Sequence, residues 1–169
     1  MKQILNMLYL SNERLPATLA CTIQQMVMCE AFVRGGARVQ FVHPFFGVKR
    51  HSPAEIYTFY DVTPCFEIGA LFSLLSLSKP PVDGKRHVKI PLVGGVSLFI
   101  STWIFALAML VRGRLDRPLV VYSRNVIGAA VFLKLKQRLA RHKPLTIVFE
   151  AHSLDQQPKR FFHKLLRES

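Results

Sequence analysis

The sequence predicts a three-layer α/β domain with a mostly parallel sheet, because two stretches read as strand–helix–strand units. In the later unit, apolar runs at residues 119–122 and 146–149 flank a helical segment at residues 126–141. Runs that are apolar at consecutive positions are typical of parallel strands covered by helices on both faces. The segment between them is long enough for a crossover that joins parallel neighbours.

The earlier unit opens the chain. Residues 4–10 form an apolar run, and a loop that contains Pro16 follows, so this loop is not helical throughout. From Ala20 onward, apolar residues recur at helical spacing until a pair of glycines stops the helix. A second strand is predicted at residues 38–42.

Between the two units the sequence is less regular. Residues 44–63 are predicted to be irregular, with aromatic rings that either cover the edge of the sheet or help to close a substrate site. Residues 66–71 are predicted to form a third strand. Residues 79–89 are basic, contain Pro and Gly and lack periodicity, which indicates an exposed linker.

Residues 90–111 carry no charge and allow two interpretations. Pro91 and the glycines at 94 and 95 disfavour helix, which leaves residues 96–111. At about 1.5 Å per residue these would span about 24 Å, short of a hydrocarbon core of about 30 Å. Basic residues flank both ends, so they give no orientation in a membrane. The length favours a buried crossover helix, and a transmembrane span is the alternative.

The overall charge points to an anionic partner. The chain has 169 residues, half of them hydrophobic, and a formal net charge of +13. Such a charge indicates nucleic acid, a membrane surface or a phosphorylated ligand. The basic residues are spread along the chain, and no nucleic-acid-binding fingerprint accompanies them. We therefore expect no nucleic acid partner.

The cysteines and the N-terminus suggest where the protein resides. The three cysteines form no CxxC pair, which suits a reducing compartment. The first apolar run is too short, and is interrupted by Asn6, for a secretory signal. We expect a cytoplasmic protein, with a peripheral position at the inner face of the membrane as the alternative.

Several cofactor motifs are missing. The loop after the first strand has no glycine, and no Walker sequence occurs anywhere, so NAD, FAD and ATP are not expected. The histidines show no metal-ligand spacing, and neither an HExxH motif nor a DxD pair is present. We expect neither a metal nor a cofactor.

Polar residues follow the two strands of the later unit. His152 and Glu150 come just after the run at residues 146–149, while Arg124 and Asn125 follow the run at residues 119–122. In open parallel sheets, ligands bind beyond these carboxyl ends. The imidazole either donates to an anionic ligand or satisfies backbone groups. Arg124 either grips a phosphate or carboxylate or is solvated beside a helix cap made by Ser123 or Asn125.

These segments resemble a known family. The stretches MKQIL, LYLSN, EAFVRGGARV, EIY, FYDV, YSRN and FEAH are similar to the N-terminal half of family 4 glycosyltransferases. These are retaining, metal-independent enzymes of the GT-B architecture, in which two Rossmann-like domains face each other across a cleft.

The resemblance implies a division of labour. Residues 1–169 would form the N-terminal Rossmann-like domain, which binds a glycan or lipid-linked acceptor in polysaccharide biosynthesis. The nucleotide-sugar donor would belong to a C-terminal domain, usually marked by Glu-x7-Glu, a motif that the chain lacks. We therefore expect the sheet to be incomplete at its C-terminus, and that domain to be absent or supplied by a partner subunit.

The resemblance also assigns residues. His152 would act near the reacting centre as the catalytic residue. The loop at residues 11–19 would lie near acceptor and phosphates, although it lacks the glycines common in the family. The residues expected to contact acceptor or donor are Asn12, Glu13, Arg14, Arg124, Asn125 and Glu150.

A second interpretation comes from a different functional class. The charge of +13 and the apolar residues 90–111 also suit a non-catalytic membrane-associated protein with a basic surface. Basic side chains near an anionic leaflet contribute about 1 kcal/mol each.

Overall fold

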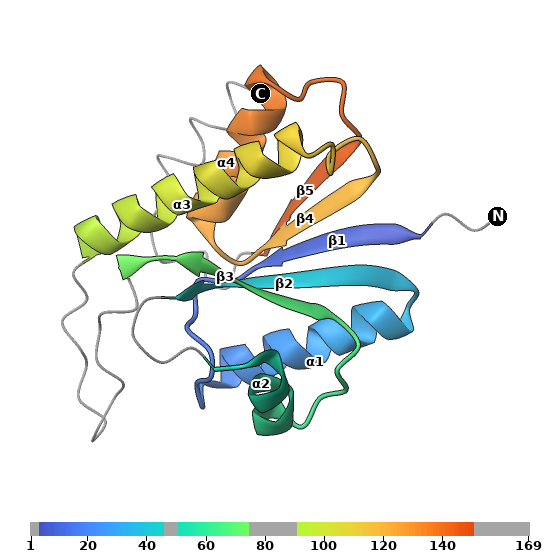
Figure 1. The fold of residues 1–169 in the computed structure, drawn as a ribbon, viewed down its shortest axis with the longest axis vertical. Helices are drawn as coiled ribbons and strands as arrows, with labels where there is room; N and C mark the ends of the chain where they lie inside the picture. Colours follow the sequence, from blue (N-terminus) through green and yellow to red (C-terminus); the bar gives the residue numbers. More distant parts are fainter. Residues whose placement is uncertain (1–3, 46–50, 75–90, 151–169) are drawn as a thin grey trace.

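The chain folds around a five-stranded, all-parallel sheet with the strand order β3-β2-β1-β4-β5 (Figure 1). The computed structural model describes residues 4–45, 51–74 and 91–150. Its elements are β1 (Leu5–Leu10), α1 (Ala20–Arg34), β2 (Ala37–Phe45), α2 (Pro53–Tyr60), β3 (Glu67–Phe72), α3 (Pro91–Val111), β4 (Leu119–Ser123), α4 (Val126–Arg138) and β5 (Leu145–Phe149).

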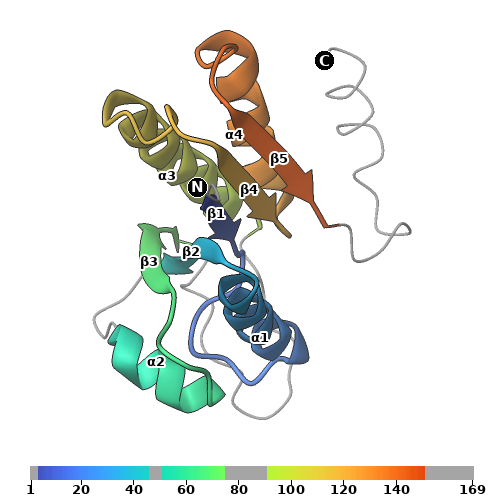
Figure 2. The ribbon, with the colours of Figure 1, turned by 90° about the vertical axis from the view of Figure 1, so that its right-hand side faces the viewer.

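Helices cover both faces of this sheet. Helices α1 and α2 lie on one side, and α3 and α4 lie on the other (Figures 1 and 2). The predicted fold class is therefore confirmed: the domain is a Rossmann-like α/β structure of three layers.

The central strand β1 shows why its sequence is apolar at consecutive positions. Leu8 and Leu10 point into the core beneath α3 and α4, and both are almost fully buried. Met7 and Tyr9 point into the core beneath α1 and α2, where Tyr9 has no exposed surface. Since successive side chains of a strand alternate between the two faces, burial on both faces requires an apolar run without alternation.

Helix α1 ends where the two glycines predict. The Gly35 N–H donates to the carbonyl of Ala31, and Gly36 follows with φ of +92°. That conformation is strained for residues with a side chain, so Gly36 turns the chain into β2 at no steric cost.

The prediction of irregular structure over residues 44–63 is wrong in part, because Pro53–Tyr60 form the helix α2. Ser52 and Glu55 form a capping box, in which the Ser52 N–H donates to Glu55 Oε2 at 2.8 Å and the Glu55 N–H donates to Ser52 Oγ at 3.2 Å. Pro53 occupies the first turn, where its missing N–H costs nothing. The sequence Ser-Pro-Ala-Glu carries this signature.

Helix α3 begins at Pro91, earlier than the sequence predicts. It contains Pro91 in its first turn and both glycines among its first five residues. Its inner side chains, among them Leu98, Thr102 and Ala106, are buried against the rest of the domain. Only 28% of residues 94–111 are buried, and the helix is long and apolar enough to cross a membrane. A soluble core helix can meet the same test, so both interpretations stay open.

Some predictions lie outside the described residues. The linker at residues 79–89, His152 and the end of the chain belong to this group.

The sheet has one topological switch point, between β1 and β4. From β1 the chain proceeds outward through β2 to β3, then returns to the other side of β1 and continues through β4 to β5. The connecting helices lie on opposite faces for these two directions (Figure 2). The loops after β1 and β4 therefore lead to opposite faces of the sheet. In folds of this type ligands bind outside these carboxyl ends, and we call this region the crevice.

Candidate functional site

Two loops border the crevice at the switch point. After β1, Ser11 is buried and its N–H donates to the Val42 carbonyl at 2.9 Å, while its Oγ accepts from the N–H of Glu13 at 3.0 Å. Asn12 is exposed, and Glu13 and Arg14 are half-buried. Three of the predicted contact residues thus lie on the loop that leads from β1 into α1.

The far end of this loop is anchored to α2. The Ala17 N–H donates to the Tyr60 hydroxyl at 2.7 Å, and this hydroxyl donates in turn to the Ala17 carbonyl at 2.9 Å. Leu15 is buried in the core beneath α1 and α2. The loop without glycine therefore has a defined path, fixed by one buried side chain and one tyrosine.

Arg124 follows β4 and reaches both α1 and the end of β5. Its side chain is 3% exposed, and Nη2 lies 3.4 Å from Glu150 Oε1 at the end of β5. Nη1 donates to the Cys21 carbonyl at 3.3 Å, and Nη2 reaches Gln24 Oε1 at 3.5 Å, both in α1. A buried charge needs such partners, since an unpaired one is strongly destabilising. Arg124 thus joins two strands to one helix.

Tyr122, on β4, completes this group, and its ring packs against the core beneath α1 and α2. Its hydroxyl donates to Glu150 Oε2 at 2.7 Å. Burial, reinforced by the hydrogen bond to Glu150 and its negative charge, raises the pKa of Tyr122 to about 12. The phenol is therefore neutral at physiological pH, and Glu150 is held by a hydroxyl on one oxygen and a guanidinium on the other.

Tyr9 lies beside Tyr122 in the strand register, with ring centroids 5.1 Å apart. Its hydroxyl is buried and has no hydrogen-bond partner among the described residues. Burial raises the pKa of Tyr9, and the positive charge of Arg124 acts in the opposite direction. A buried hydroxyl without a partner is costly, so this one is a candidate contact for a bound water or ligand.

Asn125 has a structural task in this geometry. Its Oδ1 accepts from the Ile127 N–H at 2.9 Å, which caps α4. The hydroxyl of Ser123 accepts from the Asn125 N–H at 3.1 Å and donates to the Asn125 carbonyl at 2.7 Å. The cap predicted as one of two roles for this segment is thus present.

The structure brings some of the predicted residues together and leaves others untested. Arg124 and Glu150 meet at the floor of the crevice, whereas the catalytic role of His152 stays a prediction. Within residues 4–45, 51–74 and 91–150, no cluster of three or more His, Cys, Asp or Glu side chains could hold a metal ion.

The sequence reasoning missed the two tyrosines. A signal was present, because Tyr9 and Tyr122 are the aromatic residues of otherwise aliphatic runs and sit one residue before the end of each strand. In a parallel sheet such positions lie side by side, next to the ligand-binding edge.

Comparison with known proteins adds no relative. No protein-family model matches the chain, and no curated protein sequence matches it. The fold and the side chains around Arg124 are therefore the features that bear on function.

Proposed function

We propose that this domain is the acceptor-side half of a glycosyltransferase that takes its sugar from a nucleotide-sugar donor. The observation that carries this function is the polar group formed by Arg124, Glu150 and Tyr122 at the switch point. It supports the proposal because it lies where Rossmann-like domains bind ligands, and because it joins the two strand ends that resemble the family.

The physical role of the crevice would be to orient the acceptor and exclude water. A second domain, on the same polypeptide or on a partner subunit, would bind the nucleotide-sugar and form the opposite wall. Holding acceptor and donor in a reactive geometry can supply about 7–11 kcal/mol of the barrier to a bimolecular reaction. The chemistry requires neither a metal nor a cofactor from this domain.

Five of the six predicted contact residues have a role in this scheme, and the sixth, Asn125, caps α4. Asn12, Glu13 and Arg14 present polar groups on the β1–α1 loop, and the Arg124–Glu150 pair joins the ends of β4 and β5. His152 follows two residues beyond Glu150 in the sequence and is proposed to stabilise charge at the reacting sugar.

The test is sugar transfer by the full chain combined with a nucleotide-sugar-binding second domain. A panel of nucleotide-sugars is offered with glycan and lipid-linked acceptors, and product is followed with radiolabelled sugar. We expect His152→Ala to lower kcat by about 100-fold or more, as for the loss of one transition-state donor. His142→Ala, which alters an exposed histidine after α4, serves as the matched control and is expected to leave transfer unchanged.

Two results would contradict this scheme. Unchanged transfer by His152→Ala would remove this histidine from the mechanism. Absence of transfer with every donor, together with absence of acceptor binding to the crevice in NMR titrations, would refute the glycosyltransferase function itself.

A second function, membrane association, is favoured by the outer face of α3. Large apolar side chains are exposed along it at spacings of three and four residues, which places them on one stripe. They are Val96, Phe99, Ile100, Ile104, Leu107 and Val111, with exposed fractions from 38% to 85%. Since the opposite face of α3 packs on the domain, we propose that the helix lies in the plane of an anionic membrane rather than across it.

Vesicle flotation tests this association. We expect Ile104→Ser to weaken binding to anionic vesicles by about five- to tenfold, because it removes a side chain that would enter the interface. Val27→Ser alters a similarly exposed side chain on α1, at the other face of the sheet, and should have no effect. Retention after a high-salt wash would indicate apolar insertion, and equal binding by both variants would exclude α3 as the contact.

A further inference from the structure

A second concave feature lies at the opposite edge of the sheet from the crevice. It is a hollow of about 340 Å³ at the amino ends of β1, β2 and β4, closed on one side by the turn that follows α3. Pockets for small molecules range from roughly 300 to 1,000 Å³, so this hollow has room for a small ligand or a headgroup. We call it the arginine hollow after the side chains that line it: Arg38, Arg112, Arg114 and Arg117.

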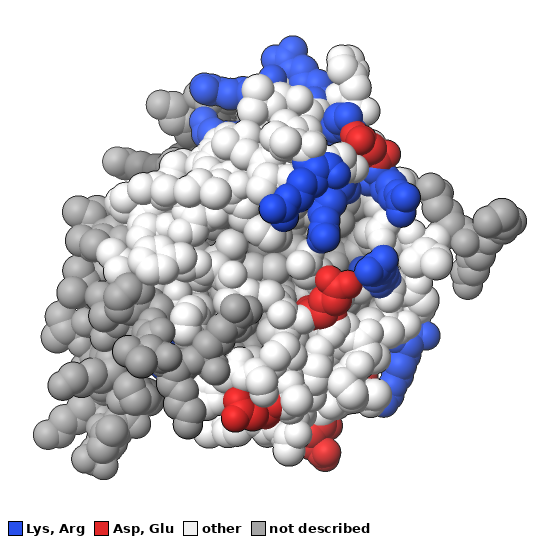
Figure 3. Space-filling view, viewed as in Figure 1, with Lys and Arg blue, Asp and Glu red and all other residues white. Residues whose placement is uncertain are grey.

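The charge of the hollow is strongly positive. Among the described residues that line it, Glu67 is the one acidic residue, and Oε1 of Glu67 pairs with Nη2 of Arg38 at 2.9 Å. Asp116, in the same turn as the other arginines, forms an ion pair with Lys143. Three arginines of the α3–β4 turn therefore line the hollow, while Glu67 is paired with the fourth lining arginine, Arg38, and Asp116 is paired with Lys143. Figure 3 shows these basic side chains gathered beside an uncharged area over α3.

A simpler explanation covers only part of this cluster. Basic residues after the C-terminus of a helix offset its dipole, but this effect is confined to the last turn. Arg112 directly follows α3 and fits that role. Arg38 is accounted for by its ion pair with Glu67 on the neighbouring strand. Arg114 and Arg117 lie three and six residues beyond Val111, outside that turn, so their place beside the hollow requires another reason.

We propose that the arginine hollow is a binding site for the phosphate groups of a small phosphorylated ligand. The planar guanidinium offers paired N–H donors that match two phosphate oxygens, and several such groups around one hollow can hold a diphosphate. The site lies at the amino edge of the sheet, away from Arg124 and Glu150, so it stands independently of the sugar-transfer function.

The test is a titration of the isotopically labelled full chain with pyrophosphate at constant ionic strength, followed by NMR. We expect saturable shifts of the backbone amides at residues 112–117 and 38–40. The double variant Arg114→Gln and Arg117→Gln should raise the dissociation constant at least about tenfold, since each lost charged hydrogen bond weakens binding severalfold or more.

The control is Arg34→Gln, which removes an exposed arginine on α1 and should leave the affinity unchanged. Shifts that do not saturate, or that persist unaltered in the double variant, would overturn the site. Shifts confined to the crevice around Arg124 would also overturn it while leaving the glycosyltransferase function standing. Because the altered arginines are exposed, the thermal midpoint of the double variant should match that of the wild type.

A second arm distinguishes a soluble phosphate ligand from a lipid headgroup. Vesicles that contain phosphatidylglycerol are sedimented with the wild type and the double variant, with and without pyrophosphate. Loss of sedimentation in the variant, and competition by pyrophosphate, assign the phosphate to a lipid. Saturable pyrophosphate binding together with unaltered sedimentation assigns it to a soluble ligand, and both results support the site.

Discussion

Arg124 and Glu150, which follow neighbouring strands of a parallel sheet, form an ion pair at 3.4 Å whose guanidinium side chain is 3% exposed. The pair lies at the switch point of the fold, just beyond the carboxyl ends of β4 and β5. The Arg124 guanidinium also donates to Cys21 and Gln24 of α1, so Arg124 holds α1 against the ends of β4 and β5. A charge buried to this degree depends on its partner.

We expect Glu150→Gln to destabilise the fold by about 1–3 kcal/mol. The range lies below that for a fully buried pair because the Glu150 side chain is 24% exposed. Urea unfolding measures the change. The double variant Arg124→Met and Glu150→Gln should be less destabilised than the sum of the two single variants, since neither charge then remains buried alone. Strict additivity would show that the two side chains do not interact.

Tyr122 should make the fold sensitive to alkali. The ordinary pKa of a tyrosine is 10.0, and that of Tyr122 is raised to about 12, mainly by burial and then by Glu150. The unfolded chain therefore ionises first, and this contribution to stability is present below pH 10 and is lost as the pH rises toward 12. Tyr122→Phe should lose less stability over this window in urea unfolding, and an identical pH profile would contradict the assignment.

The sequence predicts the central strands well because Met7–Leu10 of β1 are buried on both faces, and β4 is buried on one face and half-buried on the other. Residues 4–10 and 119–122 lack alternation for that reason, and a continuous apolar run bounded by polar residues is hard to misread. Helix α2 is only eight residues long, too short for helical periodicity to reveal it. Its signal is the local capping box of Ser52 and Glu55, which periodicity does not detect.

The site is predictable only where topology brings residues together. Arg124 and Glu150 follow adjacent parallel strands, so their proximity follows from strand order. The contact of Arg124 with Gln24 joins residues 100 positions apart, and no spacing in the sequence reveals it. The arginine hollow is hidden for the same reason, because Arg38 and Arg117 meet only after the sheet has formed.

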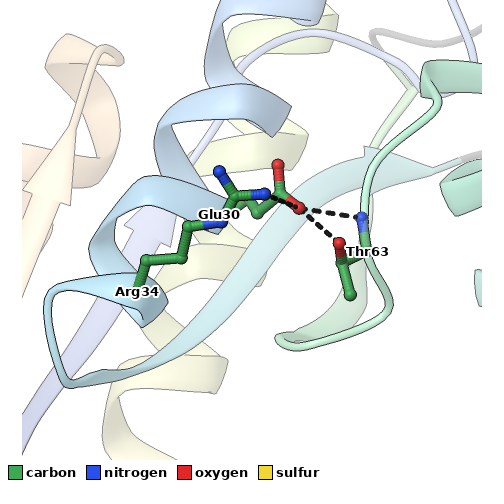
Figure 4. Close-up of polar contacts among 3 residues, drawn as sticks. All are labelled: Glu30, Arg34 and Thr63. Atoms are coloured by element: carbon green, nitrogen blue, oxygen red, sulfur yellow. Dashed lines mark hydrogen bonds and ion pairs between the residues drawn. The ribbon is translucent and has the colours of Figure 1, made fainter.

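Glu30 links α1 to the loop before β3 (Figure 4). Its Oε1 accepts from Nη2 of Arg34 at 3.0 Å and from the N–H of Thr63 at 3.2 Å, and also from the Thr63 hydroxyl. These contacts, the hydrogen bonds from Thr63 above all, lower the pKa of Glu30 below its ordinary value of 4.5. The carboxylate thus stabilises the fold above that pH, and the contribution is lost as the pH falls through the lowered pKa.

We therefore expect Glu30→Gln to reduce the loss of stability between neutral and acidic pH, with acid unfolding followed by circular dichroism. Thr63→Val should act in the same direction, because it removes the hydroxyl donor while the N–H remains. Glu55→Gln provides a control from another helix terminus on the same side of the sheet. An acid transition unchanged by both Glu30→Gln and Thr63→Val would contradict the role of this contact.

Gly128, in the first turn of α4, sits against the carboxyl ends of two strands. A Cβ atom there would lie 2.9 Å from Leu10 Cδ1 and 3.1 Å from Ser123 Oγ, both of buried residues. Alanine favours a helix over glycine by about 0.5–1 kcal/mol, but overpacking a filled core typically costs about 1–3 kcal/mol. We expect the steric cost to win, so that Gly128→Ala destabilises the fold.

Gly95→Ala is the matched control for this effect. Among the described residues, a Cβ atom at Gly95 would meet Ile127 Cδ1 alone, at an ordinary contact distance of 3.8 Å. The helix preference then acts without a steric penalty, and the variant should gain about 0.5–1 kcal/mol. Urea unfolding of the two variants side by side separates packing from propensity. A gain of stability in both variants would contradict this prediction. It would mean that α4 packs less closely on β1 and β4 than the distances at Gly128 require.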